Sequence, residues 1–296
     1  MKPIIVVVGP TAVGKSEMAI RIAQKMGAEI ISGDAFQFYK RLDIGTTKLS
    51  VDEWRGIKHH LIDILSPNDP FSVADYQKVV RAKIDELRAR NITPILVGGS
   101  GLYIQSVIYD YRFTGSKREE DSELSKMANG ELWNLLHNIA PEIASVTDIS
   151  NRRRLLRALE LASEKTEEDE PNSYGKNLFY PEVQIIGLEM PRDILYASID
   201  ARVDKMMQLG LEAEVKKLHD EGIRSQATMA IGYKELYAYF DGLTSLETAI
   251  SLIKQQTRRY AKRQLTWFKN QMQAKWYLVN PLDFESTVLQ VLNDLE

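Results

Sequence analysis

Residues 4–16 read IIVVVGPTAVGKS, a strand pattern that runs directly into a glycine-rich loop. The five β-branched residues at 4–8 are typical of a parallel strand that is covered on both faces. The next eight residues, 9–16, match the complete phosphate-loop pattern G-x-x-x-x-G-K-[ST], and helical spacing follows over 17–25. Strand, loop and helix in this order predict a phosphate-binding loop at the edge of a parallel sheet.

The chemistry of this loop follows from its backbone and from two side chains. Glycines let backbone N–H groups turn toward phosphate oxygens, and the helix that follows adds the positive end of its dipole. Lys15 adds a mobile positive charge, and the Ser16 hydroxyl is a ligand for Mg²⁺, the expected cofactor. The residues expected to bind a diphosphate or a nucleotide are Gly9, Pro10, Thr11, Ala12, Val13, Gly14, Lys15 and Ser16.

The rest of the chain extends this unit into an α/β fold. Strand patterns recur at 29–32, 60–64, 94–97 and 183–188, residues 276–279 are a candidate last strand, and 72–90 have helical periodicity. This alternation predicts an α/β fold with a P-loop NTPase-like parallel sheet core. Residues 115–182 show no convincing strand, so we predict an inserted all-helical domain there, between core segments 1–114 and 183–296.

Composition excludes several classes of protein. The chain has 38 basic and 41 acidic residues, which excludes a protein that coats nucleic acid through a globally basic surface. It has no cysteine, which excludes disulfides, thiolate nucleophiles and cysteine-ligated zinc. No apolar run has the length of a membrane span or a signal peptide, so we expect a cytoplasmic protein. The four histidines lack metal-ligand spacing, and we interpret all four as structural.

A carboxylate follows the strand expected at 29–32. Asp34 would lie at the carboxyl edge of the sheet, beside the phosphate loop, where open α/β sheets bind ligands. It could be a metal ligand, a substrate-binding group, a general base or a structural turn residue. The loop alone does not identify the reaction: the chain lacks the Asn-Lys-x-Asp motif of GTPases, and the strand at 94–97 ends in Gly-Gly-Ser instead of an aspartate.

Two segments concentrate basic residues. Residues 248–282 contain seven Lys or Arg and no Asp or Glu, and Lys254, Arg258 and Lys262 share one helix face at a spacing of four. Like charges at this spacing repel unless an anion lies opposite, and Arg side chains match phosphate geometry, so we predict polyanion binding. The candidate residues are Lys254, Arg258, Arg259, Lys262 and Arg263, together with Arg152, Arg153, Arg154 and Arg157 of the second segment.

Polar and aromatic side chains are interleaved with the basic residues of 248–282. Gln255, Gln256 and Gln264 offer amides to nucleobases, whereas Trp267 and Phe268 are interpreted as core anchors in preference to stacking platforms. The run of acidic residues at 164–170 is more negative than expected beside an RNA surface.

Taken in order, the motifs of the chain resemble the tRNA dimethylallyltransferase (tRNA isopentenyltransferase) family. They are GPTAVGKS (9–16), SGDAFQFY (32–39), LDIGTTK (42–48), VGGSGLY (97–103), NRRRLLRALE (151–160), AIGYKE (230–235) and TRRYAKRQ (257–264). They occur in the family's order from Gly9 to Phe268, which is more specific than any single motif. The lack of a zinc-finger pattern at the carboxyl end resembles bacterial members.

The resemblance implies a reaction and its partners. The family transfers the dimethylallyl group of dimethylallyl diphosphate to N6 of the adenosine on the 3′ side of the anticodon, in tRNAs that read codons beginning with U, and releases pyrophosphate. The P-loop, with Lys15 and Thr11 as catalytic groups, would hold the diphosphate. Lys234 would lie near the same phosphates. We expect a monomer whose partners are this diphosphate and the tRNA anticodon stem-loop, with no membrane partner.

The resemblance also assigns the tRNA contacts. Asp34 would act as general base on the amine of a flipped adenine, and the residues expected to contact bases beside it are Ala35, Phe36, Gln37 and Ser100. Domain 115–182 would clamp the anticodon stem-loop through its arginine cluster, and the basic helix near 254–263 would contact the RNA backbone. Three alternatives remain: an adenylate isopentenyltransferase that uses free nucleotides, a P-loop small-molecule kinase, and a non-enzymatic RNA-binding module.

Overall fold

The computed structural model describes residues 2–113, 123–163 and 177–295. The chain divides into two compact units, Met1–Asp110 with Asn177–Glu296, and Tyr111–Lys176, which are described separately. The chain returns to the larger unit before residue 182, the predicted end of the insert. Tyr109 forms an antiparallel bridge with Leu178, and the Asp110 amide donates to the carbonyl oxygen of Asn177 at 3.0 Å, so these residues belong to the larger unit.

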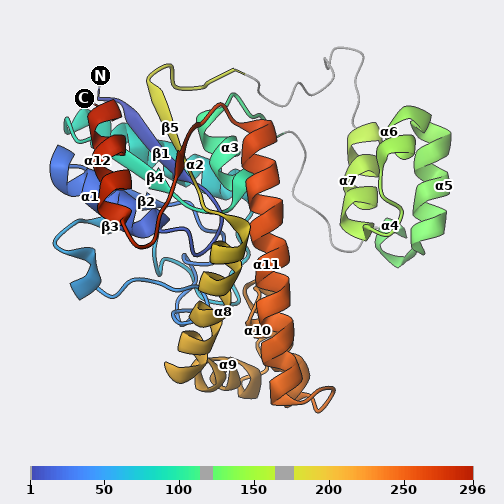
Figure 1. The fold of residues 1–296 in the computed structure, drawn as a ribbon. Helices are drawn as coiled ribbons and strands as arrows, with labels where there is room; N and C mark the ends of the chain where they lie inside the picture. Colours follow the sequence, from blue (N-terminus) through green and yellow to red (C-terminus); the bar gives the residue numbers. More distant parts are fainter. Residues whose placement is uncertain (1, 114–122, 164–176, 296) are drawn as a thin grey trace. The chain divides into compact units, whose positions relative to one another are not determined.

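The larger unit is built on one six-stranded parallel sheet, which confirms the predicted α/β fold class (Figure 1). Its order is β3-β2-β4-β1-β5-β6, and the described strands pair in parallel. The strands are β1 (Ile4–Val8), β2 (Glu29–Ser32), β3 (His59–His60), β4 (Pro94–Val97), β5 (Val183–Glu189) and β6 (Lys275–Leu278). Because β1 lies inside the sheet, its five residues are buried on both faces, as their composition predicted.

Strand β3 is shorter than predicted. The apolar pattern at 60–64 predicts a strand, but β3 ends at His60. Leu61 and Asp63 adopt φ values of 61° and 55°, a left-handed conformation that cannot continue a strand. The chain therefore turns away from the sheet there, and Ile62 lines a pocket instead.

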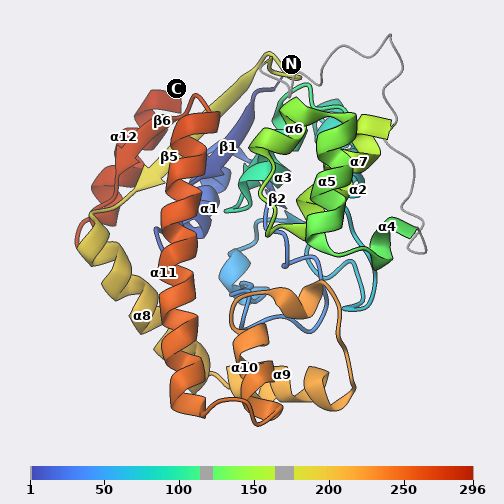
Figure 2. The same cartoon turned by 90° about the vertical axis from the view of Figure 1, so that its right-hand side faces the viewer.

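Helices cover both faces of the sheet (Figures 1 and 2). Ile5 and Val7 of β1 pack in a core with α1 (Lys15–Met26), α8 (Arg192–Gln208) and α12 (Phe284–Leu295). Alternate strand residues such as Val6 pack in a second core with α2 (Val73–Ala89), α3 (Gly101–Ile108), α9 (Leu211–Asp220), α10 (Tyr233–Phe240) and α11 (Leu246–Gln271). Short 3-10 turns occur at η1 (Asp52–Trp54) and η2 (Ala227–Met229).

Helix α11 is the longest described helix, with 26 residues. Its N-cap is Ser245, which precedes the first helical residue and whose side chain accepts a hydrogen bond from the Thr248 amide. Its buried stripe includes Ile253, Gln264 and Phe268, and the helix contacts α3, α8 and α10. A span of roughly 39 Å, from 1.5 Å of rise per residue, lets one helix contribute to several parts of the larger unit.

The regular secondary structure described in the smaller unit is entirely helical. It consists of α4 (Glu123–Lys126), α5 (Asn129–Ile139), α6 (Pro141–Val146) and α7 (Arg152–Ser163). Its core is formed by the buried residues Leu132, Leu136, Ala144, Leu155, Ala158 and Leu159. The acidic run at 164–170 lies outside the described residues. Among the residues the structure describes, no helix is long and apolar enough to cross a membrane.

Candidate functional site

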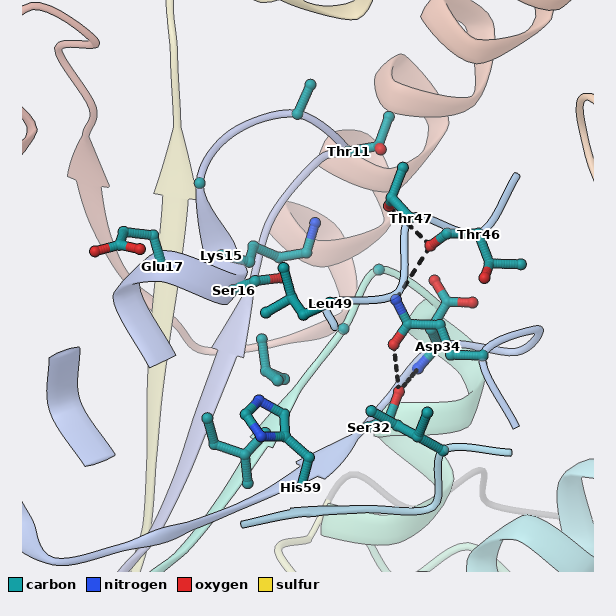
Figure 3. A pocket seen from close by; sticks show the side chains of 18 of the residues that line it. Thr11, Lys15, Ser16, Glu17, Ser32, Asp34, Thr46, Thr47, Leu49 and His59 are labelled. Carbon is teal, nitrogen blue, oxygen red and sulfur yellow. Dashed lines mark hydrogen bonds between the residues drawn. The ribbon is translucent and has the colours of Figure 1, made fainter. Parts of the chain in front are cut away.

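A pocket of about 310 Å³ lies at the carboxyl edge of the sheet, and the phosphate loop forms one of its walls (Figure 3). Lys15 and Asp34 reach it from different elements, the first from α1 and the second from the turn after β2. Residues that line it include Thr11, Ala12, Gly14, Lys15, Ser16, Ser32, Asp34, Gln37, Thr46, Thr47, Leu49, His59, Arg202, Tyr260 and Gln264. The structure thus brings five of the eight predicted loop residues together with Asp34 and Gln37, whereas Gly9, Pro10 and Val13 are absent from the described lining.

The phosphate loop is held by contacts within itself and with α11. Gly9 has a φ of 146°, and a Cβ there would lie 2.5 Å from the Leu188 carbonyl oxygen, so this position requires glycine. The Lys15 ammonium donates to the Pro10 carbonyl at 2.7 Å. The Thr11 amide donates to Gln264 Oε1 at 2.9 Å.

Gln264 connects two loops of the pocket. It is buried, and its Nε2 donates to the Gly99 carbonyl at 2.9 Å while its Oε1 accepts from the Thr11 amide. The interpretation of Gln264 as an amide offered to nucleobases is therefore wrong, because both polar atoms of its side chain are engaged within the protein. Gln264 instead fixes the phosphate loop relative to the loop after β4.

Two cations and one carboxylate determine the electrostatics of the pocket. Burial, followed by repulsion from Arg202, lowers the pKa of Lys15 to about 7, and Asp34 opposes this change. Burial also lowers the pKa of Arg202, against the influence of Asp34. Burial disfavours the charged forms of both Lys15 and Arg202. A multivalent anion bound between them would compensate both charges, so the pair is suited to bind such an anion.

Asp34 is held in a fixed orientation by backbone contacts. Its Oδ1 accepts from the Phe36 amide at 2.9 Å, and Ser100 Oγ accepts from the Ala35 amide at 3.0 Å, so both anchors act on the same turn. Burial raises the pKa of Asp34, and the Phe36 amide and then Lys15 partly oppose the rise. A carboxylate that is oriented, facing a pocket and of raised pKa is suited to accept a proton.

Several predicted site residues do not line the pocket. Phe36 packs against the hydrophobic core, and Ser100 fixes the Asp34 turn. Lys234 lies on α10 with its ammonium 3.7 Å from a Glu235 carboxylate oxygen, and it is absent from the described lining of the pocket. The cation beside Lys15 in this structure is Arg202, so the geometry gives no support to Lys234 as a ligand of the phosphates.

The basic face of α11 divides into a paired part and an exposed part. Lys254 lies 2.6 Å from Asp204, and Arg258 pairs with Asp200, so α8 supplies the anions that the spacing of these cations required. The exposed residues Arg259, Lys262 and Arg263 line a shallow groove together with Trp267. Phe268 is buried, which confirms it as a core anchor, whereas the Trp267 indole packs over Gly101 and remains 37% exposed.

The arginine cluster of the smaller unit is also divided. Arg152 donates to the Met127 carbonyl at 2.6 Å and to Asn129 Oδ1 at 3.1 Å, so it holds the start of α7 against the preceding helices. Arg157 pairs with Glu160 at 3.2 Å. Arg153 and Arg154 are exposed, so they are the members of this cluster whose surface positions suit an external anion.

Among the pocket residues that sequence reasoning did not predict are Arg202, Thr47 and His59. Arg202 falls on the buried stripe of α8 with Leu195, Ile199 and Met206, and a cation at a core position of a helix was the signal that could have found it. Thr47 lies in the motif LDIGTTK (42–48), which marked this loop without assigning Thr47 a role. His59 lines the pocket (Figure 3), but its Nδ1 contacts the Ile57 carbonyl oxygen at 2.9 Å and its ring stacks on Trp54, which agrees with a structural histidine.

Gly98 supports the turn that carries Asp34. A Cβ at this position would lie 2.2 Å from the Gly33 carbonyl oxygen, a contact with backbone that no side-chain rotation relieves. We expect Gly98→Ala to lower stability by about 1–3 kcal/mol and to reduce turnover, because Asp34 must shift. Thermal unfolding measures the first effect. As a control, Gly130→Ala on α5, where a Cβ meets nothing within 4 Å, should leave the melting temperature unchanged or raise it slightly. A Gly98 variant as stable as the Gly130 variant would contradict this account.

Comparison with known proteins identifies relatives over nearly the whole chain. The family model described as IPP transferase matches residues 37–271. The tRNA dimethylallyltransferase of Bacillus subtilis is 49% identical over 294 residues, which cover 96% of this chain and 93% of that protein. The protein of the same name from Anoxybacillus flavithermus is 46% identical over 299 residues, covering 99% of this chain and 96% of that protein.

Solved structures agree with these relatives. The tRNA isopentenylpyrophosphate transferase of Bacillus halodurans has a TM-score of 0.77 and 40% identity, with 100% of this chain and 96% of that chain covered. A eukaryotic dimethylallyltransferase acting on tRNA has a TM-score of 0.81 and 27% identity, and the match covers 100% of this chain and 79% of that chain. The similarity therefore includes the segments that form the pocket.

Proposed function

Because the chain belongs to the IPP transferase family, we propose that it transfers the dimethylallyl group of dimethylallyl diphosphate to an adenosine of tRNA. The chain is an enzyme of the kind that its curated relatives represent. The proposed acceptor atom is N6 of the adenosine on the 3′ side of the anticodon, in tRNAs that read codons beginning with U. Pyrophosphate is the second product.

One observation supports this function above the others. A single pocket presents the phosphate loop, with Lys15 and Arg202, together with the oriented carboxylate of Asp34. The cations and loop amides suit a diphosphate, and the carboxylate suits a group that loses a proton. Alkyl transfer from a diphosphate to an amine requires both in one place.

The reaction follows from these groups. The N6 lone pair forms a bond to C1 of the dimethylallyl group while the bond from C1 to the diphosphate oxygen breaks, and its electron pair leaves with pyrophosphate. Lys15 and Arg202 stabilise the negative charge that grows on the leaving group. The amine becomes cationic as it is alkylated, and Asp34 accepts its proton. The adenine must leave its stack to reach the pocket.

Magnesium is part of this proposal. Ser16 lies in the first turn of α1 and lines the pocket, so its hydroxyl lies beside the expected diphosphate. The described residues contain no group of three or more His, Cys, Asp or Glu that could hold a metal. This fits Mg²⁺, which binds proteins through one or two groups and takes its other ligands from phosphate and water. When bound, Mg²⁺ would neutralise charge on the leaving diphosphate.

The experiment that tests the function uses purified protein, labelled dimethylallyl diphosphate and Mg²⁺. One reaction contains unmodified tRNA that reads a codon beginning with U, a second contains AMP, and a third contains labelled ATP without the prenyl donor. Label in tRNA alone is the expected result. Label in AMP would indicate a free-nucleotide isopentenyltransferase, and phosphoryl transfer from ATP without prenylation would indicate a kinase. A tRNA that is bound but never labelled would indicate an RNA-binding module.

The exposed basic groove of α11 is the proposed contact for the tRNA backbone. We expect the double variant Lys262→Ala with Arg263→Ala to weaken tRNA binding and to reduce the slope of log affinity against log salt by about 2, one for each lost phosphate contact. Titration of tRNA at several salt concentrations measures both. The control is Lys254→Ala, whose ammonium is already paired with Asp204. An equal loss of salt dependence in the control variant would place the RNA elsewhere.

A further inference from the structure

The geometry points to Glu214 as a positioning residue: it fixes the loop 42–48 so that Thr47 holds Arg202 in the pocket. Glu214 lies on α9 and is absent from the described lining of the pocket. This inference rests on the proposed function, because it concerns the cation that would bind the diphosphate. It concerns a residue that neither the phosphate loop nor the basic segments would identify.

The carboxylate of Glu214 collects four hydrogen bonds. Its Oε2 accepts from the amides of Asp43 at 3.0 Å and Ile44 at 2.8 Å. Its Oε1 accepts from the Gly45 amide at 3.1 Å and from the Tyr233 hydroxyl at 2.6 Å. Three consecutive backbone N–H groups on one carboxylate form an anion nest in which the anion belongs to the protein itself. The conformation of this turn therefore depends on Glu214.

Packing supports the same arrangement. The Tyr233 side chain is buried, and a Cβ on Gly45 would lie 2.3 Å from its ring. Glycine at 45 thus allows the loop to lie directly on Tyr233 while the Tyr233 hydroxyl donates to Glu214. The motif 42–48 and the motif 230–235 are joined through this one carboxylate, although they are far apart in the sequence.

The two residues that follow the turn bound by Glu214 lie in the pocket, so the position of the turn determines theirs. Thr46 and Thr47 follow Gly45 and line the pocket, and Gln37 Nε2 donates to the Thr46 carbonyl at 3.1 Å. Thr47 has a φ of 51°, a left-handed conformation that is strained for a β-branched residue. Such a conformation persists only where neighbouring contacts enforce it, and it often occurs at functional sites.

The strained residue contacts the missed cation. The Thr47 hydroxyl accepts a hydrogen bond from Arg202 Nη2. No ion pair joins Arg202 to a carboxylate of the described residues, although Lys15 repels its charge and Asp34 attracts it. The hydrogen bond to Thr47 is directed, so it fixes the position of the guanidinium in the pocket. The chain of contacts runs from Glu214 through the turn at 43–45 to Thr47 and then to Arg202.

The test measures the affinity of each variant for dimethylallyl diphosphate by calorimetry without tRNA, and its affinity for tRNA separately. We expect Glu214→Gln to weaken donor binding about tenfold to a hundredfold, the effect of misplacing one charge-assisted hydrogen bond, with tRNA affinity unchanged. Thr47→Val, which removes the hydroxyl and keeps the shape, should weaken donor binding similarly. The double variant should be no weaker than the weaker single variant, because both changes act on one contact.

The control is Glu212→Gln, two residues earlier on α9, which makes the same change of charge outside this network and should bind the donor as the wild type does. If Glu214→Gln does not fold, Tyr233→Phe removes one of the four hydrogen bonds and should show a smaller loss of donor affinity in the same direction. Wild-type donor affinity in folded Glu214→Gln, or in Tyr233→Phe when Glu214→Gln does not fold, would overturn the inference, and so would additive losses in the double variant. Failure of the wild type to bind the donor or to prenylate tRNA would instead overturn the proposed function.

Discussion

Asp34→Asn is expected to lower turnover about 10²–10⁴-fold while tRNA and dimethylallyl diphosphate still bind. The amide keeps the size of the carboxylate, and its oxygen can still accept from the Phe36 amide, so the turn keeps its anchor. What is lost is the group that accepts the proton from N6. Single-turnover prenylation of tRNA, together with separate measurements of binding, distinguishes the loss of chemistry from the loss of affinity.

The pH dependence provides a second measurement of the same assignment. Burial raises the pKa of Asp34, so the carboxylate is protonated and inactive at a pH where an ordinary aspartate, of pKa about 3.9, is already ionised. The value of kcat/KM should therefore fall as pH decreases through this raised pKa. An acid limb at the ordinary aspartate pKa, or activity in Asp34→Asn within about tenfold of wild type, would contradict the role of general base.

The same substitution should not lower stability. Because the folded state raises the pKa of Asp34, the ionised carboxylate is less stable in the folded protein than in the unfolded chain. The loss of folding free energy from the ionised Asp34 grows as pH rises from the pKa of Asp34 in the unfolded chain to its higher pKa in the folded protein. Above that pH the loss is constant. Asparagine does not ionise, so at neutral pH Asp34→Asn should unfold at an equal or higher temperature than the wild type.

Arg202→Gln is expected to lower kcat about 10²–10³-fold, the effect of removing one group that stabilises charge on a leaving group. We expect this effect because Arg202 lines the same pocket as Lys15, and its charge contributes to the lowered pKa of Lys15. Rapid-quench measurement of pyrophosphate release gives the rate of the chemical step. The repulsion also predicts that the pKa of Lys15 rises in this variant.

A matched control exists on the same helix. Lys205 is an exposed residue of α8, and Lys205→Gln makes the same change of charge without altering the pocket. We expect its kcat to equal that of the wild type. If both variants lose the same small factor, the effect of Arg202 is a long-range field and not a contact with the leaving group.

The fold was largely predictable because its signals are local. The apolar strand at 4–8, the loop at 9–16 and the strand pattern at 94–97 each have a composition that few other structures accommodate. The error at 60–64 arose because an apolar pattern does not reveal that Leu61 adopts a left-handed conformation. The earlier return of the chain to the core at Asn177 rests on a few contacts, such as the bridge from Tyr109 to Leu178 and the hydrogen bond from Asp110 to Asn177, which leave no periodic pattern in the sequence.

The site was predictable only where one motif contains its residues. Lys15 and Asp34 each lie in a recognisable motif that follows a strand. The parallel sheet brings the carboxyl ends of those two strands to the same edge. The sequence pattern around Arg202 indicates only how its helix packs, and the pattern around Thr47 does not indicate which residue Thr47 contacts. The pairing of Lys254 with Asp204 was hidden for the same reason, since the partner lies 50 residues away on another helix.

Gln264 has a consequence for the mutational tolerance of α11. Its side chain donates to the Gly99 carbonyl and accepts from the Thr11 amide, so it needs a donor and an acceptor at the end of a three-carbon reach. Glutamate lacks the donor, lysine lacks the acceptor, and asparagine is too short. Each leaves a buried polar group unpaired, at a cost of about 1–3 kcal/mol. One turn of a single helix therefore combines a position that tolerates few substitutions with an exposed neighbour, Arg263, whose replacement leaves no buried polar group unpaired.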